Sequence, residues 1–186
     1  MRKIILASNS PRRKELLGGL GYEFEVRVID GIDESYPDGL TMEEIPRYIA
    51  AAKASAYTVG ADELLLTADT VVVLDEEVLG KPADAADAAR MLHALSGRTH
   101  HVITGVCLKT QDDERRFSVS TEVTFKALTD EEIDHYISHY HPYDKAGAYG
   151  IQEWIGYIGV TGIRGSYFNV MGLPVQRIYQ ELQGML

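Results

Sequence analysis

Hydrophobic and polar positions are distributed along the chain in a pattern that predicts strands and helices in turn. The apolar segment Lys3–Ala7 predicts a short buried strand. Ser10-Pro11 then predicts the start of a helix, because serine is a favoured N-cap and proline suits the first helical position. Residues 22–29 alternate and predict a second strand, whereas residues 64–74 are almost continuously apolar, which is typical of a buried central strand.

The rest of the chain continues this mixed order. The further predicted elements are a loop over 30–41, helices over 45–58 and 84–95, a hairpin of strands 99–109 and 115–127, a helix over 130–140, a strand over 154–160, and short helices near 166–171 and from about Pro174. Thr41 with Glu44 resembles a capping box, but Pro46 favours a later helix start. The order predicts an α/β fold with α+β character and a mixed sheet. With no repeat or linker, residues 1–186 form one structural unit, with enough length for two lobes around a cleft.

Composition narrows the class of protein. The net charge of −10 argues against generic nucleic-acid binding, because a polyanion would be repelled over most of the surface. No apolar run approaches the roughly 18 residues of a membrane span, and polar residues arrive too early for a signal peptide. The single cysteine, Cys107, excludes an intrachain disulfide and a cysteine cluster for zinc, and is expected to be a small strand residue. A cytoplasmic location is the expectation.

Asp69 stands out because it interrupts the apolar strand predicted at 64–74. A buried carboxylate is costly unless it is paired, hydrogen-bonded or bound to a cation, so its presence in a core strand points to function. The alternative is structural: a hydroxyl of Thr67 or Thr70, together with a lysine, satisfies the carboxylate.

The segment from Ser8 to Arg13 has the features of an anion site. A strand that ends in a small polar loop and enters a helix presents free backbone N–H groups. Arg12 and Arg13 occupy the first helical turn, where the helix dipole disfavours cations unless an anion offsets them. The Walker pattern GxxxxGK[ST] is absent. The alternative is an exposed basic turn, which is how most charge clusters end up.

Three lysines have short or turn-forming neighbours that would let them lean into a cleft: Lys53, Lys81 and Lys145. Each one alone is more often a solvated lysine. Asp33 and Glu34 are candidate metal ligands or second bases on a polar loop, with solvent exposure as the alternative. The six histidines lack metal-binding spacing. His135 and His139 are four positions apart, but the glutamate of the HExxH motif is absent between them.

Taken together, these segments resemble the Maf family of nucleoside triphosphate pyrophosphatases. The matching segments are Ser8–Leu17, Lys53-Ala54, Ala68–Val72, Leu79–Pro82, Thr104–Val106, Asp144–Gln152, Gly165–Tyr167 and Asn169–Pro174. They occur in family order over essentially the whole chain, and a set in this order is far more specific than any single motif.

The resemblance implies a two-lobed fold related to the inosine triphosphate pyrophosphatases, with an active cleft between the lobes. It implies hydrolysis of a nucleoside triphosphate to the monophosphate and pyrophosphate, with Asp69 as the general base. It implies that the triphosphate is bound by Ser8, Arg12, Arg13, Lys53, Lys81 and Lys145. Arg12, Thr70 and Gln152 match positions that set base preference and resemble the dTTP/UTP branch. Glu34 matches an acid that, with Asp69, helps hold a divalent cation, Mg²⁺ or Mn²⁺. A homodimer is plausible by analogy.

Two rival functions remain open at the sequence level. One is a purine-specific pyrophosphatase of the inosine-triphosphate type. The other is a non-catalytic nucleotide-binding regulator of cell division, since the family has been linked to septum formation. The intact Asp69 beside the basic residues favours the enzyme.

Overall fold

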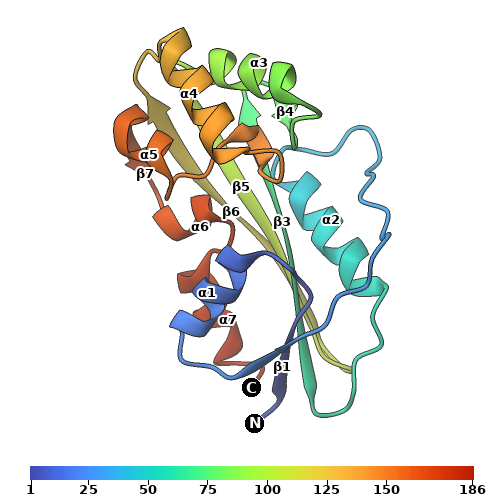
Figure 1. Ribbon diagram of the computed structural model, residues 1–186. Helices are drawn as coiled ribbons and strands as arrows, with labels where there is room; N and C mark the ends of the chain where they lie inside the picture. The colour runs from blue at the N-terminus through green and yellow to red at the C-terminus, as the bar shows by residue number, and fades with distance from the viewer. The chain divides into compact units, whose positions relative to one another are not determined.

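The computed structural model describes residues 1–186 and has a mixed α/β fold, as the sequence predicted. A seven-stranded sheet has the strand order β2-β1-β3-β5-β6-β7, and β4 pairs with β3 outside this path (Figure 1). The chain divides into two compact units. Unit 1 comprises residues 1–70, 104–119 and 172–186, and unit 2 comprises residues 71–103 and 120–171. None of the helices is long and apolar enough to cross a membrane.

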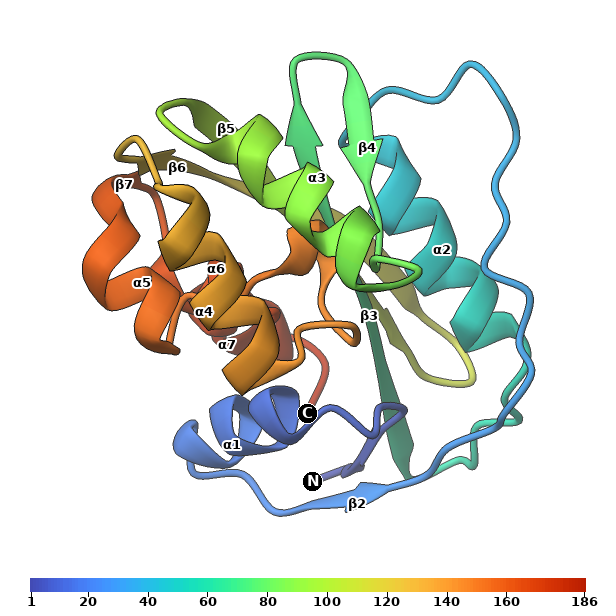
Figure 2. The same ribbon diagram turned by 45° about the horizontal axis from the view of Figure 1, so that its top comes forward.

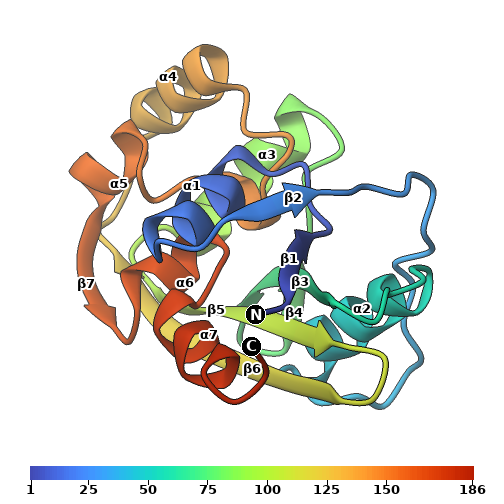
Figure 3. The ribbon, with the colours of Figure 1, turned by 90° about the horizontal axis from the view of Figure 1, so that it is seen from below.

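Unit 1 is built around a parallel β-α-β segment. Its elements are β1 (Lys3–Leu6), α1 (Pro11–Gly19), β2 (Phe24–Val26), α2 (Glu44–Ser55), α7 (Val175–Leu182), and the adjoining parts of β3 (Glu63–Leu74), β5 (Thr99–Lys109) and β6 (Glu114–Phe125). Strand β1 pairs in parallel with both β2 and β3 and lies between them (Figure 3). Because β1 and β2 are parallel, they need the crossover that α1 provides.

The helix starts of unit 1 follow local capping chemistry. The Ser10 side chain accepts a hydrogen bond from the Arg13 backbone N–H, which caps α1 as predicted. Helix α2 begins at Glu44 with Glu43 as its N-cap, one residue before the predicted start at 45 and later than a helix capped by Thr41 would begin, as Pro46 indicated. Thr41 N–H donates to the Glu44 carboxylate at 2.8 Å, and Glu44 N–H donates back to the Thr41 hydroxyl at 3.4 Å. Pro46 is the third helical residue, where its missing N–H has no intrahelical partner to lose.

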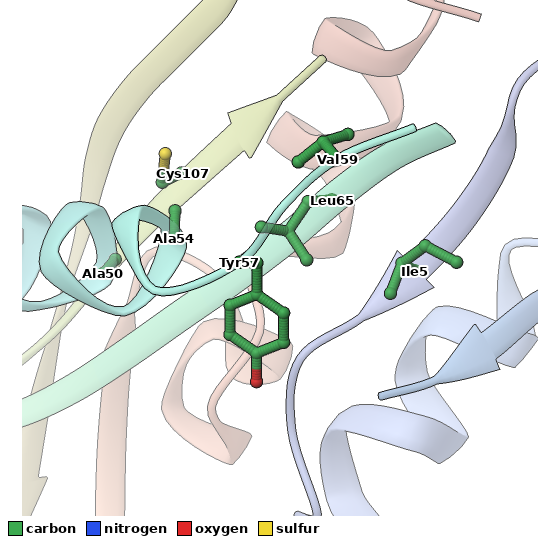
Figure 4. Packing of buried hydrophobic residues seen from close by; sticks show 7 residues of the cluster. All are labelled: Ile5, Ala50, Ala54, Tyr57, Val59, Leu65 and Cys107. Carbon is green, nitrogen blue, oxygen red and sulfur yellow. The ribbon is translucent and has the colours of Figure 1, made fainter. Parts of the chain in front are cut away.

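The core of unit 1 depends on small residues that let α2 approach the sheet. Figure 4 shows a buried cluster formed by Ile5, Ala50, Ala54, Tyr57, Val59, Leu65 and Cys107. At Gly105 in β5, an added Cβ atom would lie 2.2 Å from the backbone N of Arg47 in α2, so only glycine permits this contact. Cys107 is a buried strand residue, and its burial raises the pKa of the thiol to about 12, which keeps it protonated.

Unit 2 combines short strands with a helical layer. Its elements are β4 (Glu77–Leu79), α3 (Ala85–Leu95), α4 (Asp130–Tyr140), the 3₁₀ turn η1 (Ala146–Ala148), α5 (Trp154–Gly159), β7 (Val160–Arg164), α6 (Tyr167–Met171), and the adjoining parts of β3, β5 and β6. Helix α3 contacts both α4 and η1 (Figure 2). The predicted capping box of α4 is formed by Thr129 and Glu132. Strands β4 and β7 pair antiparallel with β3 and β6.

Residues 154–160 do not form the strand that the sequence predicted. Helix α5 covers Trp154–Gly159, and β7 begins only at Val160. The buried residues of α5, Ile155 and Gly159, are four positions apart, which is helical spacing. The prediction failed because the aromatic and β-branched residues here have high strand propensity, while tertiary packing selects the helical period. The strand predicted at 22–29 is also shorter, since β2 covers only Phe24–Val26.

Candidate active site

Strand β3 and helix α2 place Asp69 against Lys53 within unit 1. Thr67 and Asp69 are two positions apart and therefore point to the same face of β3. The Thr67 hydroxyl donates to the Ala50 carbonyl at 2.6 Å, and one helical turn later the Lys53 ammonium lies 3.0 Å from Asp69 Oδ1. Both charged side chains are largely buried, at 13% exposure for Asp69 and 16% for Lys53. The Thr67 bond thus fixes the register of α2 that brings Lys53 to Asp69.

The ammonium of Lys53 joins two carboxylates. Besides Asp69, it lies 3.1 Å from Glu34 Oε1, and Glu34 is half exposed on the loop between β2 and α2. The structural alternative for Asp69 is therefore correct in one part, since a lysine does pair with the carboxylate. The two hydroxyls named in that alternative bond elsewhere. Thr67 donates to Ala50, and the Thr70 hydroxyl bonds Arg13 and Thr104.

Asp69 and Glu34 are the two carboxylates beside Lys53 that could serve as ligands of a divalent cation. Nowhere in the chain do three or more His, Cys, Asp or Glu side chains gather in a group that could hold a metal ion. Asp69 and Glu34 supply two hard oxygen ligands around one position. Mg²⁺ is commonly bound through one or two carboxylates, with water and substrate phosphates completing its shell.

The guanidinium of Arg13 braces β3 on both sides of Asp69. It donates to the Ala68 carbonyl at 3.1 Å, to the Thr70 hydroxyl at 3.1 Å and to the Gly172 carbonyl at 2.8 Å. Burial lowers the pKa of Arg13 and the charge of Asp69 opposes that shift, while an arginine stays protonated in any case. Three of its five N–H groups are used in this way. Two N–H groups of Arg13 therefore remain for the predicted contact with phosphate.

The other residues of the predicted anion site lie at the start of α1. Ser8 is buried, and its hydroxyl accepts a hydrogen bond from the Ser10 backbone N–H at 3.2 Å. Arg12 is partly buried in the first turn, which contains no acidic residue. Unit 1 therefore contains seven of the predicted site residues, on the loop after β1, on α1, on the loop before α2, on α2 and on β3: Ser8, Arg12, Arg13, Glu34, Lys53, Asp69 and Thr70.

Unit 2 holds the remaining predicted residues. Lys81 is exposed directly after β4, whereas the Lys145 side chain is only 11% exposed. The backbone N–H of Gly147 donates to the Gly80 carbonyl at 3.1 Å, which joins the two lysine-bearing segments. Gln152 lies just beyond, and its side-chain Oε1 is buried without a hydrogen-bond partner. A buried acceptor in this state is costly, so it marks a place where a ligand donor would be favourable.

Sequence reasoning missed two residues beside Lys145. Glu153 Oε1 lies 3.5 Å from the Lys145 ammonium, and the same atom accepts a hydrogen bond from the Tyr136 hydroxyl at 2.9 Å. The only available signal was that Glu153 directly follows Gln152. No sequence pattern connects position 136 in a helix with position 153.

Comparison with known proteins identifies the family of the chain. The chain matches the family model described as Maf-like protein over residues 3–185. A dTTP/UTP pyrophosphatase of Phocaeicola vulgatus is 66% identical over 97% of this chain and 95% of its own length. A protein of the same name from Parabacteroides distasonis is 62% identical over the same shares. Among solved structures, a HAM1 protein from Coxiella burnetii matches with a TM-score of 0.43 and 19% identity, over 67% of this chain and 73% of its own. The chain belongs to the Maf family.

Proposed function

We propose that this protein hydrolyses dTTP and UTP to the nucleoside monophosphate and pyrophosphate. The observation that carries the proposal is the buried carboxylate of Asp69 on β3, held by Lys53 and braced on both sides by Arg13. Relatives that are more than 60% identical over nearly their full length and are named dTTP/UTP pyrophosphatase support the same activity.

In the proposed reaction, Asp69 is the general base. The bond from Lys53 uses Oδ1, so we assign Oδ2 to the attacking water. The water loses a proton to Asp69 as its oxygen bonds to the α-phosphorus. The bond from the α-phosphorus to the bridging oxygen breaks in line, and its electron pair leaves with pyrophosphate. Because Asp69 is fixed by two neighbouring elements, the base is oriented before substrate arrives.

Negative charge on the triphosphate needs a matching set of donors. We assign this role to Ser8, Arg12, Arg13 and Lys53 in unit 1 and to Lys81 and Lys145 in unit 2. Guanidinium and ammonium groups stabilise the charge that builds on the leaving pyrophosphate. Glu34 and Asp69 would hold a divalent cation, Mg²⁺ or Mn²⁺, which when bound neutralises charge on the phosphate oxygens. Removing divalent ions with EDTA is expected to abolish turnover, and added Mg²⁺ or Mn²⁺ to restore it.

The base preference follows from hydrogen-bond chemistry. Uracil and thymine present an N3–H donor, whereas cytosine presents a bare N3 acceptor. The unpartnered Oε1 of Gln152 would accept the N3–H of a uracil or thymine base. Arg12 and Thr70 are the other two residues that we assign to base selection. The rejection of a base that lacks the donor is then a consequence of leaving a buried acceptor unpaired.

A panel of nucleoside triphosphates with pyrophosphate as the readout tests the proposal. We expect dTTP and UTP to give the highest kcat/KM, ahead of CTP, ATP, GTP and ITP. A panel led by ITP would instead support a purine-specific pyrophosphatase. Tight dTTP binding with no pyrophosphate release would support the non-catalytic regulator of cell division.

Two further assignments complete the proposal. We place the enzyme in the cytoplasm, where the single buried thiol needs no oxidised partner. A homodimer is our expectation for the assembly, and light scattering coupled to size-exclusion chromatography measures it.

A further inference from the structure

The hydroxyl of Tyr136 connects helix α4 to the loop that carries Lys145 and Gln152. Tyr136 is fully buried, yet its hydroxyl forms two hydrogen bonds. It donates to Glu153 Oε1 at 2.9 Å and accepts from the Gly150 backbone N–H at 3.0 Å. A phenolic hydroxyl has one proton to donate and lone pairs to accept with, so both bonds are satisfied together.

Burial favours the protonated form of this hydroxyl. Burial raises the pKa of Tyr136 well above its ordinary value, which the Gly150 N–H only partly opposes, and the nearby carboxylate of Glu153 raises it further. The hydroxyl is therefore available as a hydrogen-bond donor to Glu153.

Glu153, held by Tyr136, in turn forms an ion pair with Lys145. Its carboxylate lies 3.5 Å from the Lys145 ammonium, and its side chain is 21% exposed. Lys145 also pairs with Asp144 at 2.9 Å, but Asp144 is 66% exposed. An exposed ion pair fixes a long side chain poorly, whereas a partly buried carboxylate held by a buried hydroxyl fixes it well. Glu153 is thus the carboxylate beside Lys145 that is itself held by a buried hydroxyl.

The turn at Gly150 leaves room for the side chains of Lys145, Gln152 and Glu153 to lie close together. A Cβ atom added at Gly150 would lie 2.6 Å from Glu153 Oε1, 3.0 Å from Lys145 Cε and 3.2 Å from Gln152 Nε2. Three functional side chains therefore meet over a backbone position that only glycine leaves open. The backbone N–H of Gly150 is itself held by Tyr136, so one hydroxyl fixes both the turn and the side chains above it.

We propose that Glu153 and Tyr136 are positioning residues for substrate binding, and that they act by holding Lys145 at the place where it meets a phosphate of the nucleotide. The inference rests on the proposed function only in taking Lys145 as a phosphate ligand. Neither residue touches the reacting atoms. Their contribution is to nucleotide affinity, with little effect on the chemical step.

A double-mutant cycle tests this directly, with dTTP as the probe. The cycle is made in the Asp69→Asn background, where Kd is measured by titration calorimetry without turnover. Glu153→Gln keeps an acceptor for Tyr136 but removes the charge that faces Lys145, and Tyr136→Phe removes only the hydroxyl. Each is expected to weaken dTTP binding by about three- to tenfold, the size of one lost net interaction. In a Lys145→Met protein the same two substitutions should change Kd less than about twofold, because the group that they position is gone.

Steady-state kinetics of the enzyme that retains Asp69 give the second readout. In the otherwise wild-type enzyme, both substitutions should raise KM for dTTP and leave kcat within about twofold, as expected for lost binding that ground and transition states share. Glu76→Gln and Tyr157→Phe, at exposed positions of unit 2, are the matched controls and should change neither value.

Three results would overturn the inference. They are an unchanged Kd in both single variants, effects that persist in full in the Lys145→Met protein, or a loss confined to kcat. A variant that fails to fold is replaced by the other, since Tyr136→Phe and Glu153→Gln alter different bonds. If the wild-type enzyme binds dTTP but releases no pyrophosphate, the proposed function fails while the Kd cycle still decides the inference.

Discussion

Replacing His100 with glutamine should remove most of the pH dependence of stability between pH 8 and pH 5. His100 is fully buried in unit 2, and its Nε2 atom is 2.6 Å from the Tyr149 hydroxyl. Its ring packs edgewise against Phe125 and Tyr149, with centroids 5.2 Å and 5.4 Å away. Burial lowers the pKa of His100 from 6.5 to about 4, and the adjacent His101 contributes a smaller lowering.

The size of the effect follows from these two pKa values. In the unfolded chain the imidazole takes up a proton near pH 6.5, whereas in the folded protein it stays neutral until about pH 4. Between these values the unfolded state binds one more proton, so stability falls as pH falls. The contribution of neutral His100 to the free energy of unfolding is present above pH 6.5. About 2 kcal/mol of it is lost between pH 8 and pH 5. The loss reaches about 3 kcal/mol below pH 4.

Urea unfolding at pH 8 and pH 5, followed by the fluorescence of the single tryptophan, Trp154, measures this difference. The His100→Gln protein starts from a lower stability, but its change between the two pH values should be close to zero. His101→Gln, at the exposed neighbouring position, is the control and should keep nearly the wild-type dependence. An equal pH dependence in wild-type and His100→Gln proteins would refute the reasoning, because another group would then carry it.

Two further predictions concern how α2 is seated in unit 1. Gly105→Ala should destabilise the protein by about 3 kcal/mol in thermal melts, because the added Cβ would overlap the backbone of α2. Gly19→Ala, at an open position of α1, is the control and should be neutral or slightly stabilising. Thr67→Val should cost about 1 kcal/mol in urea unfolding, because the Ala50 carbonyl loses its donor. It should also lower kcat for dTTP, since Lys53 is no longer held in register, and an unchanged kcat would contradict that role.

Local chemistry explains which parts of the fold were predictable. The cap of α1 at Ser10 and the capping box at Thr129 depend on residues within three positions of each other, and both form as the sequence indicated. The carboxylate of Asp69 was recognisable because an acid inside an apolar strand conflicts with its surroundings. In α5 the local strand propensity and the tertiary packing disagree, and the packing decides.

Contacts between distant positions explain what the sequence could not provide. Arg13 bonds a carbonyl 159 positions away, at Gly172, as well as two residues of β3. Its position in the first turn of α1 suggested an anion ligand, but its side chain turns to the backbone of the strand. Tyr136 and Glu153 meet only because α4 packs beside the loop that follows η1. No periodicity or capping rule encodes such a contact.

The central claim is that Asp69 is the base of a nucleotide pyrophosphatase, and the Asp69→Asn protein tests it most directly. Pyrophosphate release from dTTP and the Kd for dTTP are measured side by side for wild type, Asp69→Asn and the exposed control Asp62→Asn. We predict that the Asp69→Asn protein loses about 10²- to 10⁴-fold in kcat, the usual contribution of a general base, while binding dTTP nearly as tightly. Asp62→Asn should match the wild type. Wild-type turnover in the Asp69→Asn protein would contradict the account.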